Sequence, residues 1–315
     1  MKITVLDGYT ENPGDLSWEE FEQVGELSVY ERSTPDEVRE RMKGAEAVII
    51  NKVPMTRELM EANPQLRYIG VLATGYDVVD IEAARDLGIA VTNVPGYGTD
   101  TVAQYAIALL LEATSRVGHH AARVKDGEWS RNADWCFWDY PLMELSGRTM
   151  GIIGYGRIGR KVAEIAKAMG MKILYYSRKE TEGEDPQAVS LEELLRNSDV
   201  VSLHCPLTSE NDSLINKDTL ALMKKSAILV NNARGKLINE EDLAQALKDG
   251  TIYAAALDVV RVEPIRDDNP LLECDNCIIT PHISWASREA RGRIMKMAAD
   301  NLVSYLRGEA VNRIV

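Results

Sequence analysis

Three polar segments in the C-terminal half of the chain each follow a short apolar run, and they carry Arg234, Glu263 and His282 in that order. In open parallel sheets ligands bind where strands end, so we expect these side chains to lie near one sheet edge. Arg234 can hold a carboxylate through paired hydrogen bonds, and His282 can exchange a proton with a substrate. Glu263 favours the imidazolium if it is hydrogen-bonded to the histidine. The segments predict an acid/base site for an anionic substrate.

A glycine-rich turn precedes these segments. Gly154, Gly156 and Gly159 form a G-x-G-x-x-G pattern between an apolar run at 150–153 and a helical pattern at 161–168. In that context the first glycine permits a sharp turn, the second lets the backbone approach a pyrophosphate, and the third lets helix and strand pack closely. The helix N-terminus presents unpaired N–H groups and a positive dipole end to phosphates. The turn predicts a dinucleotide site; a tight turn without a ligand is the alternative.

The residues after the second strand of this unit bear on the choice of dinucleotide. That strand, expected at 172–176, is followed by Ser177, Arg178 and Lys179. A carboxylate normally ends this strand and accepts hydrogen bonds from the adenosine ribose. A hydroxyl followed by two cations can instead bind a 2′-phosphate. The sequence therefore predicts NADPH in preference to NADH, unless Arg178 is only a solvated surface charge.

With these features in place, the sequence resembles the D-isomer-specific 2-hydroxyacid dehydrogenase family over essentially its whole length. The matching segments are the glycine turn 154–159, the strand and loop 203–208, residues 231–235 and 258–264, Pro281-His282, and the loop 73–77. Within the family it is most similar to the branch of glycerate dehydrogenases and hydroxypyruvate–glyoxylate reductases. The sequences TGYD at 74–77 and NVPGYGTDTVA at 93–103 carry this closer assignment, together with the aromatic segment before the glycine turn.

The resemblance implies roles for further residues. Backbone N–H groups of Thr74 and Gly75 would complete the grip on the substrate carboxylate, and Lys52 is a candidate for steering the anion. Asp258 is implied near the nicotinamide carboxamide, and Ala233 near the ring. The implied cofactor-binding residues are Gly154, Gly156, Arg157, Ile158, Gly159, Ser177, Arg178, Lys179, Cys205, Pro206, Ala233 and Asp258.

The resemblance also implies a reaction. NAD(P)H would supply hydride to a small 2-oxo acid held by Arg234, with hydroxypyruvate or glyoxylate favoured, and His282 would donate the proton that completes the D-2-hydroxy acid. Glutamine occupies the Glu263 position in the related formate dehydrogenases, whose reaction needs no proton transfer, so the glutamate favours acid/base chemistry. Two alternatives stay open: a dehydrogenase for a bulkier 2-oxo acid, and an NAD(H)-sensing corepressor similar to the C-terminal-binding proteins, which would bind the dinucleotide without turnover.

The elements that must position these residues alternate between short apolar runs and helical patterns, which is typical of parallel α/β sheets. The resemblance implies two flavodoxin/Rossmann-like, doubly wound domains, with an NAD(P)-binding domain (99–287) inserted into a substrate domain (1–98 and 288–315). One long helix is expected over 99–125. The aromatic segment 129–145 has no clear period, and we expect it to form a homodimer interface or, alternatively, to fold back on its own domain.

Composition limits the partners and the compartment. The chain has 315 residues and a formal net charge of −13, so nucleic acid and anionic membrane surfaces are disfavoured. We expect a cytoplasmic protein, since the sequence shows neither a signal peptide nor an apolar run long enough for a bilayer. No bound metal is expected, because Cys274 and Cys277 lack further ligands nearby and the adjacent His119 and His120 cannot both face one ion. His204 is expected to be hydrogen-bonded locally.

Overall fold

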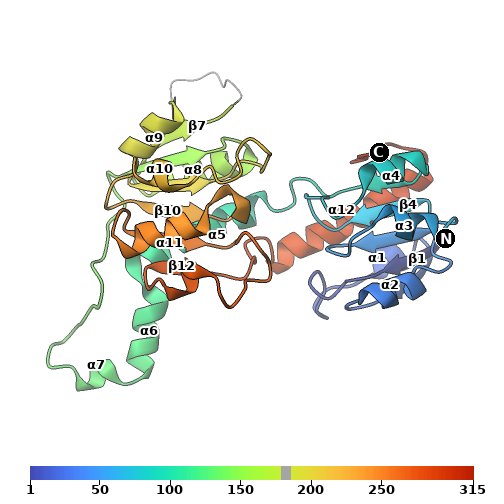
Figure 1. Ribbon diagram of the computed structural model, residues 1–315. Helices are drawn as coiled ribbons and strands as arrows, with labels where there is room; N and C mark the ends of the chain where they lie inside the picture. Colours follow the sequence, from blue (N-terminus) through green and yellow to red (C-terminus); the bar gives the residue numbers. More distant parts are fainter. Residues whose placement is uncertain (179–185) are drawn as a thin grey trace. The chain divides into compact units, whose positions relative to one another are not determined.

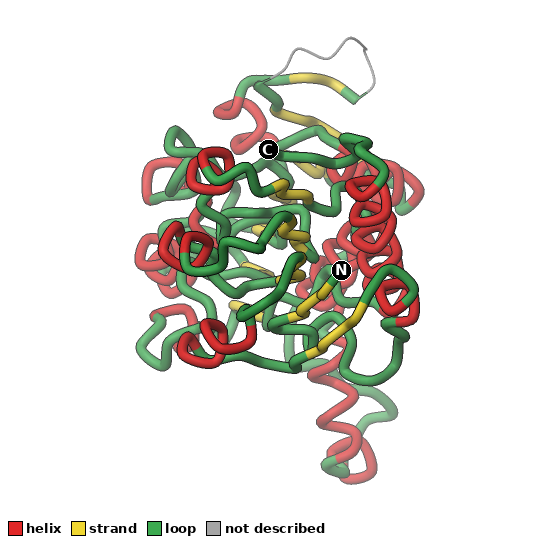
Figure 2. Tube along the Cα trace, turned by 90° about the vertical axis from the view of Figure 1, so that its right-hand side faces the viewer, coloured by secondary structure: helices red, strands yellow, loops and turns green. Residues whose placement is uncertain are grey.

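The computed structural model describes residues 1–178 and 186–315, which form two compact units (Figure 1). Unit 1 comprises Met1–Gly98 and Trp285–Val315, and unit 2 comprises Thr99–Ser284, so unit 2 is inserted into unit 1. Unit 1 resumes at Trp285, close to residue 288, where the substrate domain is expected to resume. Figure 2 shows the strands lying between flanking helices. The predicted fold class, two parallel α/β domains, is confirmed.

Unit 1 is built on a five-stranded parallel sheet with the order β2-β1-β3-β4-β5. Its strands are β1 (Lys2–Val5), β2 (Glu26–Val29), β3 (Ala47–Ile50), β4 (Tyr68–Val71) and β5 (Ala90–Thr92). Its helices are α1 (Glu19–Glu22), α2 (Pro35–Arg41), α3 (Arg57–Glu61), α4 (Ile81–Asp86) and α12 (Arg288–Leu306). Every residue of β3 and β4 is buried, which explains why both read as unbroken apolar runs.

Unit 2 is built on a seven-stranded parallel sheet with the order β12-β11-β10-β9-β6-β7-β8. Its strands are β6 (Thr149–Ile153), β7 (Lys172–Tyr176), β8 (Gln187–Ala188), β9 (Val200–Leu203), β10 (Ile228–Asn231), β11 (Ala254–Leu257) and β12 (Cys277–Ile279). Its helices are α5 (Thr99–Ser115), α6 (Val117–Lys125), α7 (Glu128–Arg131), α8 (Arg157–Ala168), α9 (Leu191–Asn197), α10 (Lys217–Leu220) and α11 (Glu240–Lys248), with 3₁₀ turns at η1 (Gly235–Leu237) and η2 (Pro270–Glu273). Because all strands are parallel, the loops that follow them share one sheet edge.

The single helix expected over 99–125 is wrong. α5 ends at Ser115, Arg116 adopts a left-handed conformation with a φ of 50°, and α6 then begins. Two contacts favour the break. The Arg116 guanidinium lies 4.7 Å from the centroid of the Tyr140 ring, and the Glu112 carboxylate accepts a 3.1 Å hydrogen bond from the Gly118 N–H at the start of α6. The periodicity of 99–125 contains no sign of the contact with Tyr140, which comes from a later segment.

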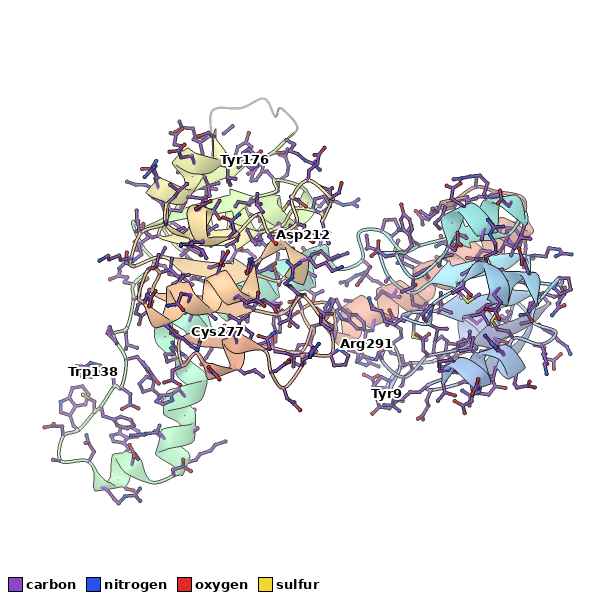
Figure 3. All side chains as sticks on the ribbon, viewed as in Figure 1. Tyr9, Trp138, Tyr176, Asp212, Cys277 and Arg291 are labelled. Carbon is purple, nitrogen blue, oxygen red and sulfur yellow. The ribbon has the colours of Figure 1, made fainter. Side chains whose placement is uncertain are left out.

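Residues 117–142, which we call the arm, project from the body of unit 2 with α6 and α7 (Figure 1). Trp135 and Trp138 on the arm are 86% and 65% exposed, and Figure 3 labels Trp138 at its outer part. The arm has contacts of its own: His119 Nε2 lies 2.6 Å from Asp139 Oδ2, and Trp129 Nε1 donates to the Trp135 carbonyl over 2.9 Å. The part with Trp135 and Trp138 therefore projects, whereas the end of the expected segment 129–145 packs on unit 2: the Met143 N–H donates to the Thr114 carbonyl over 3.1 Å, and Leu145 is buried in the core.

Candidate active site

The glycine turn joins β6 to α8, and its three glycines meet different constraints. Gly154 has a φ of 97°, and a Cβ there would lie 2.4 Å from the backbone nitrogen of Cys205. A Cβ on Gly159 would lie 2.2 Å from the Gly154 carbonyl oxygen, so α8 packs directly on the turn. A Cβ on Gly156 would meet no atom within 4 Å, and the exposed Arg157 and half-buried Ile158 begin α8 without a side-chain cap. The backbone here is open to a pyrophosphate, so the turn fits a dinucleotide.

Ser177 and Arg178 follow β7 as expected, whereas Lys179 lies outside the described residues. Arg178 Nη1 donates to Glu210 Oε2 over 3.0 Å, and both side chains are exposed. An exposed pair of this kind contributes about 1 kcal/mol or less to stability. A 2′-phosphate would therefore compete with Glu210 for Arg178. Glu210 carries no local sequence signal, because its contact with Arg178 joins segments that are far apart in the chain.

The loop after β9, residues 204–213, lies against the glycine turn, and we call it the Cys205 loop. Asn211 holds it: its Oδ1 accepts from the Thr208 N–H over 2.7 Å, and its Nδ2 donates to the Pro206 carbonyl over 2.9 Å. Burial raises the pKa of the Cys205 thiol, against an opposing effect of the nearby Arg178 charge. The thiol is therefore neutral near pH 7, and Cys205 and Pro206 offer apolar and backbone groups beside the turn.

The predicted acid/base residues come together. β10, β11 and β12 are neighbours in the sheet, and Glu263 and His282 lie on the loops that follow β11 and β12. Glu263 Oε2 lies 2.6 Å from His282 Nδ1, and Glu263 Oε1 accepts from the Val260 N–H over 3.2 Å. The carboxylate therefore fixes the orientation of the imidazole and favours a proton on Nδ1. This pair can donate or accept a proton through Nε2.

Asp258 has a contact set that the sequence did not predict. The side chain is buried, and its Oδ1 accepts from Thr280 Oγ1 over 2.6 Å and from the Ile283 N–H over 2.9 Å. Its Oδ2 accepts from the Ser284 N–H over 2.7 Å. One carboxylate thus holds the backbone directly after His282 and the Thr280 side chain before it. The resemblance alone implies a place for Asp258 near the cofactor, and these contacts add a role in shaping the loop that carries His282.

Arg234 lies on the loop after β10, residues 231–238, which we call the Arg234 loop. The buried Asn231 stabilises it: its Oδ1 accepts from the Ala233 N–H over 3.0 Å, and its Nδ2 donates to the Arg234 carbonyl over 3.0 Å. Arg234 Nη1 donates to the Ala233 carbonyl over 2.8 Å. The loop after β11, residues 258–264, is the Glu263 loop. The two loops follow adjacent strands, so Arg234 and the Glu263–His282 pair belong to one edge of the unit 2 sheet.

The candidate substrate residues of unit 1 lie at the carboxyl ends of its adjacent strands β3 and β4. The Lys52 N–H donates to Asp7 Oδ2 over 2.6 Å, which fixes the loop and leaves the side chain exposed. Thr74 Oγ1 donates to the Val94 carbonyl over 2.9 Å. The exposed Thr74 and half-buried Gly75 thus occupy a loop held by its own side chain. At these positions the N–H groups of Thr74 and Gly75 and the Lys52 ammonium could bind an anion.

The other side chains considered from sequence have local partners. His204 Nε2 lies 2.9 Å from Ser202 Oγ, and burial lowers the His204 pKa to about 4, so the ring is neutral near pH 7. Burial raises the pKa of the Cys277 thiol to about 12 and raises that of Cys274 as well. Within the described residues, no three His, Cys, Asp or Glu side chains are grouped so that they could hold a metal ion.

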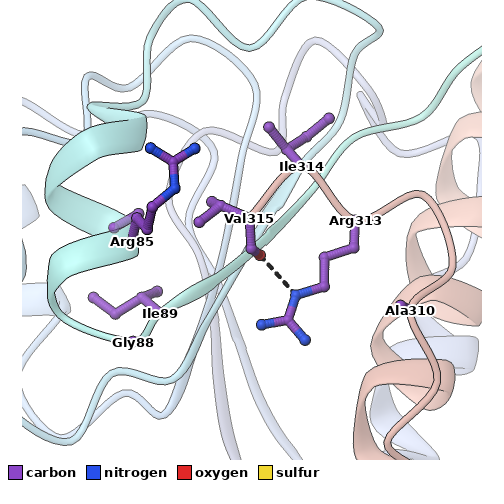
Figure 4. Close-up of a pocket in the computed structure, with 8 residues that line it drawn as sticks. Arg85, Gly88, Ile89, Ala310, Arg313, Ile314 and Val315 are labelled. Atoms are coloured by element: carbon purple, nitrogen blue, oxygen red, sulfur yellow. Dashed lines mark hydrogen bonds between the residues drawn. The ribbon is translucent and has the colours of Figure 1, made fainter.

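A separate surface pocket of about 540 Å³ lies on unit 1, and none of these residues lines it. It is formed by α4 and by residues 310–315, and Arg85, Arg313 and Val315 are among its lining residues (Figure 4). Arg313 Nε donates to the Val315 carbonyl over 2.8 Å, and Arg85 is paired with Glu82. Both guanidinium groups are therefore engaged within unit 1, and the pocket contributes nothing to the candidate active site.

Comparison with known proteins gives the family. The model of the D-isomer specific 2-hydroxyacid dehydrogenase NAD binding domain matches residues 107–284. A hydroxypyruvate reductase from Blautia hydrogenotrophica is 54% identical over 318 aligned positions that cover 99% of each chain. The chain belongs to the D-isomer-specific 2-hydroxyacid dehydrogenases. A glycerate dehydrogenase of this family from Methylorubrum extorquens is 42% identical, with 95% of each chain covered.

Solved structures agree with this assignment to the D-isomer-specific 2-hydroxyacid dehydrogenases. The TT0316 protein from Thermus thermophilus has a TM-score of 0.87 at 37% identity, and both chains are covered completely. An acyclic imino acid reductase solved with NADPH and D-Arg has the same TM-score of 0.87 at 31% identity, again over both whole chains. The predicted family and enzyme class are confirmed: the protein is an oxidoreductase with a domain for a nicotinamide cofactor. Among the described helices, none is long and apolar enough to cross a membrane.

Proposed function

We propose that this dehydrogenase reduces a small 2-oxo acid, with hydroxypyruvate or glyoxylate favoured, to the D-2-hydroxy acid. The observation that carries the proposal is the 2.6 Å contact between Glu263 Oε2 and His282 Nδ1 at the sheet edge that also bears Arg234. Relatives named hydroxypyruvate reductase, glycerate dehydrogenase and glyoxylate reductase support the substrate class.

The side chains then have distinct roles in the reduction. Arg234 binds the carboxylate of the 2-oxo acid through its planar guanidinium and so orients the carbonyl group. His282 Nε2 donates a proton to the carbonyl oxygen as it becomes an alkoxide, and Glu263 stabilises the imidazolium that carries this proton. In unit 1, the N–H groups of Thr74 and Gly75 and the Lys52 ammonium bind the substrate as an anion. In the reverse direction His282 accepts the hydroxyl proton.

We infer that NADPH is the preferred cofactor. The residues that would hold it are Gly154, Gly156, Arg157, Ile158 and Gly159 for the pyrophosphate, Ser177, Arg178 and Lys179 for the 2′-phosphate, and Cys205, Pro206, Ala233 and Asp258 for the remaining groups. When bound, the cofactor supplies the hydride. Ser177 stands where a carboxylate would repel the 2′-phosphate, and Arg178 follows it, which supports the preference. The solved relative that contains NADPH shows that this fold accommodates it.

We also infer a cytoplasmic homodimer. The arm exposes Trp135 and Trp138 by 86% and 65%, and exposed aromatic side chains gathered on one projecting segment are typical of a subunit interface. The four cysteines are free thiols, which agrees with a reducing compartment.

The test is a panel of 2-oxo acids assayed with NADPH and with NADH at saturating cofactor. We expect turnover of hydroxypyruvate or glyoxylate with a higher kcat/KM for NADPH than for NADH. His282→Ala is expected to lower kcat by about 10²–10⁴-fold and to retain NADPH binding, because the imidazole acts as a general acid and not as a cofactor ligand. If the wild-type protein binds NADPH but does not oxidise it with any 2-oxo acid of the panel, the proposal is contradicted and a corepressor-like binding protein is favoured.

A further inference from the structure

The Arg234 loop and the Glu263 loop touch through their backbones. A Cβ on Gly235 would lie 2.0 Å from the carbonyl carbon of Val260 and 2.6 Å from the backbone nitrogen of Arg261. A side chain at Gly235 would therefore push the two loops apart, and with them the residues proposed to bind the carboxylate and to orient His282. This close approach sets the spacing of the loops, and other groups must hold it.

The Arg261 guanidinium joins the Glu263 loop to two other loops. Arg261 Nη1 lies 3.1 Å from the Ile238 carbonyl oxygen and 3.3 Å from that of Lys236, both on the Arg234 loop. The same nitrogen lies 3.1 Å from Asp212 Oδ1 and 3.1 Å from Ser213 Oγ, which belong to the Cys205 loop. Two N–H protons thus serve four oxygens, and the cation lies where the three loops converge. Figure 3 labels Asp212 at this part of unit 2.

Direct contacts between the loops support this convergence. The Ser213 N–H donates to the Lys236 carbonyl over 2.8 Å, so the Cys205 loop and the Arg234 loop are also joined by their backbones. Ser213 and Arg261 hydrogen bonds lower the pKa of Asp212, which keeps this carboxylate charged for the guanidinium. The Cys205 loop in turn lies against the glycine turn, because a Cβ on Gly154 would strike its backbone.

Glu240 anchors Arg261 from the opposite side. It is the first residue of α11, and its side chain is buried. Its Oε1 accepts from the Arg261 N–H over 2.6 Å, and its Oε2 accepts from Asn269 Nδ2 over 2.9 Å. Hydrogen bonds to a charged acceptor are among the stronger ones in proteins, so the Glu263 loop is tied firmly to the start of α11.

We propose that Arg261 and Glu240 are positioning residues that hold the Arg234, Glu263 and Cys205 loops in one arrangement. Through them, the groups proposed to bind the substrate, to move the proton and to line the dinucleotide site keep a fixed geometry within unit 2. This inference rests on the proposed function and extends it to residues that touch neither substrate nor cofactor. The half-buried Arg261–Asp212 pair adds little to overall stability, whereas misplacing a catalytic group by about 1 Å can cost about 10²-fold in rate.

The test compares Arg261→Met with Arg266→Met. Arg266 lies close by in sequence, but its exposed guanidinium pairs with Asp268, so it serves as a matched control. For Arg261→Met we expect a drop in kcat of about 10- to 100-fold, as for a small displacement of catalytic groups, and a raised KM for the 2-oxo acid. Arg261→Lys keeps the charge, so we expect its kcat and its KM for the 2-oxo acid to lie between those of Arg261→Met and wild type.

Hydrogen exchange of the cofactor-free chain gives a readout that does not depend on turnover. Peptides that cover residues 204–213 and 231–238 should exchange faster in Arg261→Met, and those of Arg266→Met should match wild type. Asp212→Asn changes an exposed side chain and is the second variant: we expect faster exchange in 204–213 alone and a raised KM for NADPH. Wild-type exchange in both Arg261→Met and Asp212→Asn, or a fall in kcat that only follows global unfolding, would overturn the proposal. A wild-type enzyme inactive on every 2-oxo acid would contradict the proposed function instead, and the exchange data would still decide the role of Arg261.

Discussion

His282 has a left-handed backbone with a φ of 55°, a conformation that costs a non-glycine residue about 1–2 kcal/mol. Asp258 offsets this cost, because its carboxylate accepts from Ile283 and Ser284 directly after the histidine and from Thr280 before it. Each of these hydrogen bonds to a buried charged acceptor contributes about 1.5–3 kcal/mol, which exceeds the strain. Asp258 therefore holds the His282 backbone in this conformation, from which Glu263 orients the ring.

Asp258→Asn tests this role. In this variant the side-chain NH₂ of the asparagine replaces one carboxylate oxygen and faces a group that is itself a donor, either a backbone N–H or the Thr280 hydroxyl. At least one buried donor therefore loses its acceptor, at a cost of about 1–3 kcal/mol. We expect a lower denaturant midpoint and a kcat at least about 10-fold below wild type, since the His282 backbone relaxes. Urea unfolding and steady-state kinetics measure the two effects. A wild-type midpoint and kcat would show that the Asp258 carboxylate is dispensable.

Glu210 is a single residue that bears on cofactor preference, because it pairs with Arg178. Its contact with Arg178 places an anion where a 2′-phosphate would also bind. Glu210→Gln should therefore lower the KM for NADPH by a few fold, as expected when an exposed competing charge is removed, and leave the KM for NADH unchanged. Glu192→Gln, which removes a similar exposed partner from Arg196, is the control. Equal changes with both cofactors would disprove a contact between Arg178 and the 2′-phosphate.

At the scale of elements, the loop after β1 is fastened to α12 by Arg291, which Figure 3 labels. Arg291 Nη1 donates to the Glu11 carbonyl over 2.9 Å, and its guanidinium binds both oxygens of Asp15 over 2.8 and 2.7 Å. The Glu11 side chain is fully buried, and its Oε1 accepts from Asn51 Nδ2 over 2.9 Å. Burial and the Asp7 charge raise the Glu11 pKa to about 8, against the opposing effects of Arg291 and Lys52.

This carboxyl makes stability depend on pH. The folded chain keeps the Glu11 proton up to about pH 8, whereas the unfolded chain releases it near pH 4.5. The contribution of protonated Glu11 to the free energy of unfolding is therefore fully present below pH 4.5 and is lost as the pH rises toward 8. Glu11→Gln, which cannot titrate, should lose less stability than wild type between pH 5 and pH 8, as measured by urea unfolding. Glu20→Gln, an exposed substitution on α1, should keep the wild-type slope, and an identical slope in Glu11→Gln would contradict a protonated Glu11.

Local signals in the sequence predicted many of the elements. Thr34 and Thr56 cap α2 and α3, and such caps can be predicted from sequence because they depend on residues only three positions apart. β2 was missed, since it is an edge strand with mostly exposed residues and no apolar run. The left-handed Arg116 was missed because Tyr140 favours it from a distant segment.

In the candidate site too, some residues can be predicted from local sequence and others depend on distant contacts. Residue type and order were enough to single out Arg234, Glu263 and His282, because their chemistry is carried by the side chains themselves. The roles of Glu210, Glu240 and Arg261 depend on contacts between loops that are far apart in sequence. Such contacts exist only once parallel strands bring the loops to one sheet edge. The sequence therefore singles out the groups proposed to act, and the structure adds the contacts that hold their loops.

At the scale of the whole molecule, the arm exposes apolar side chains outside the body of unit 2 (Figure 1). Trp135 and Trp138 are exposed there, together with Trp129 and Leu142, in a chain whose net charge of −13 otherwise favours solubility. If two arms meet in a dimer, these side chains supply its apolar contact area.

The double substitution Trp135→Ser with Trp138→Ser should weaken the proposed homodimer. Removing two aromatic anchors from an interface commonly costs about 2 kcal/mol or more for each, so we expect a dissociation constant raised by at least about 10²-fold. Sedimentation velocity over a range of concentrations measures this change. Leu272→Ser, an exposed apolar position on η2, is the control and should remain dimeric. A wild-type chain that sediments as a monomer at all concentrations would rule out the homodimer.

The insertion of unit 2 into unit 1 has a consequence for biosynthesis. Every residue of unit 2 has been made once the ribosome passes Ser284, whereas unit 1 still lacks α12. Ile294, Ala298 and Leu302 of α12 pack in the same core cluster as Ile3 and Tyr68, so the first unit to be started cannot close its core until the last helix emerges. The dinucleotide domain is thus the first part of the chain that can fold to completion during translation.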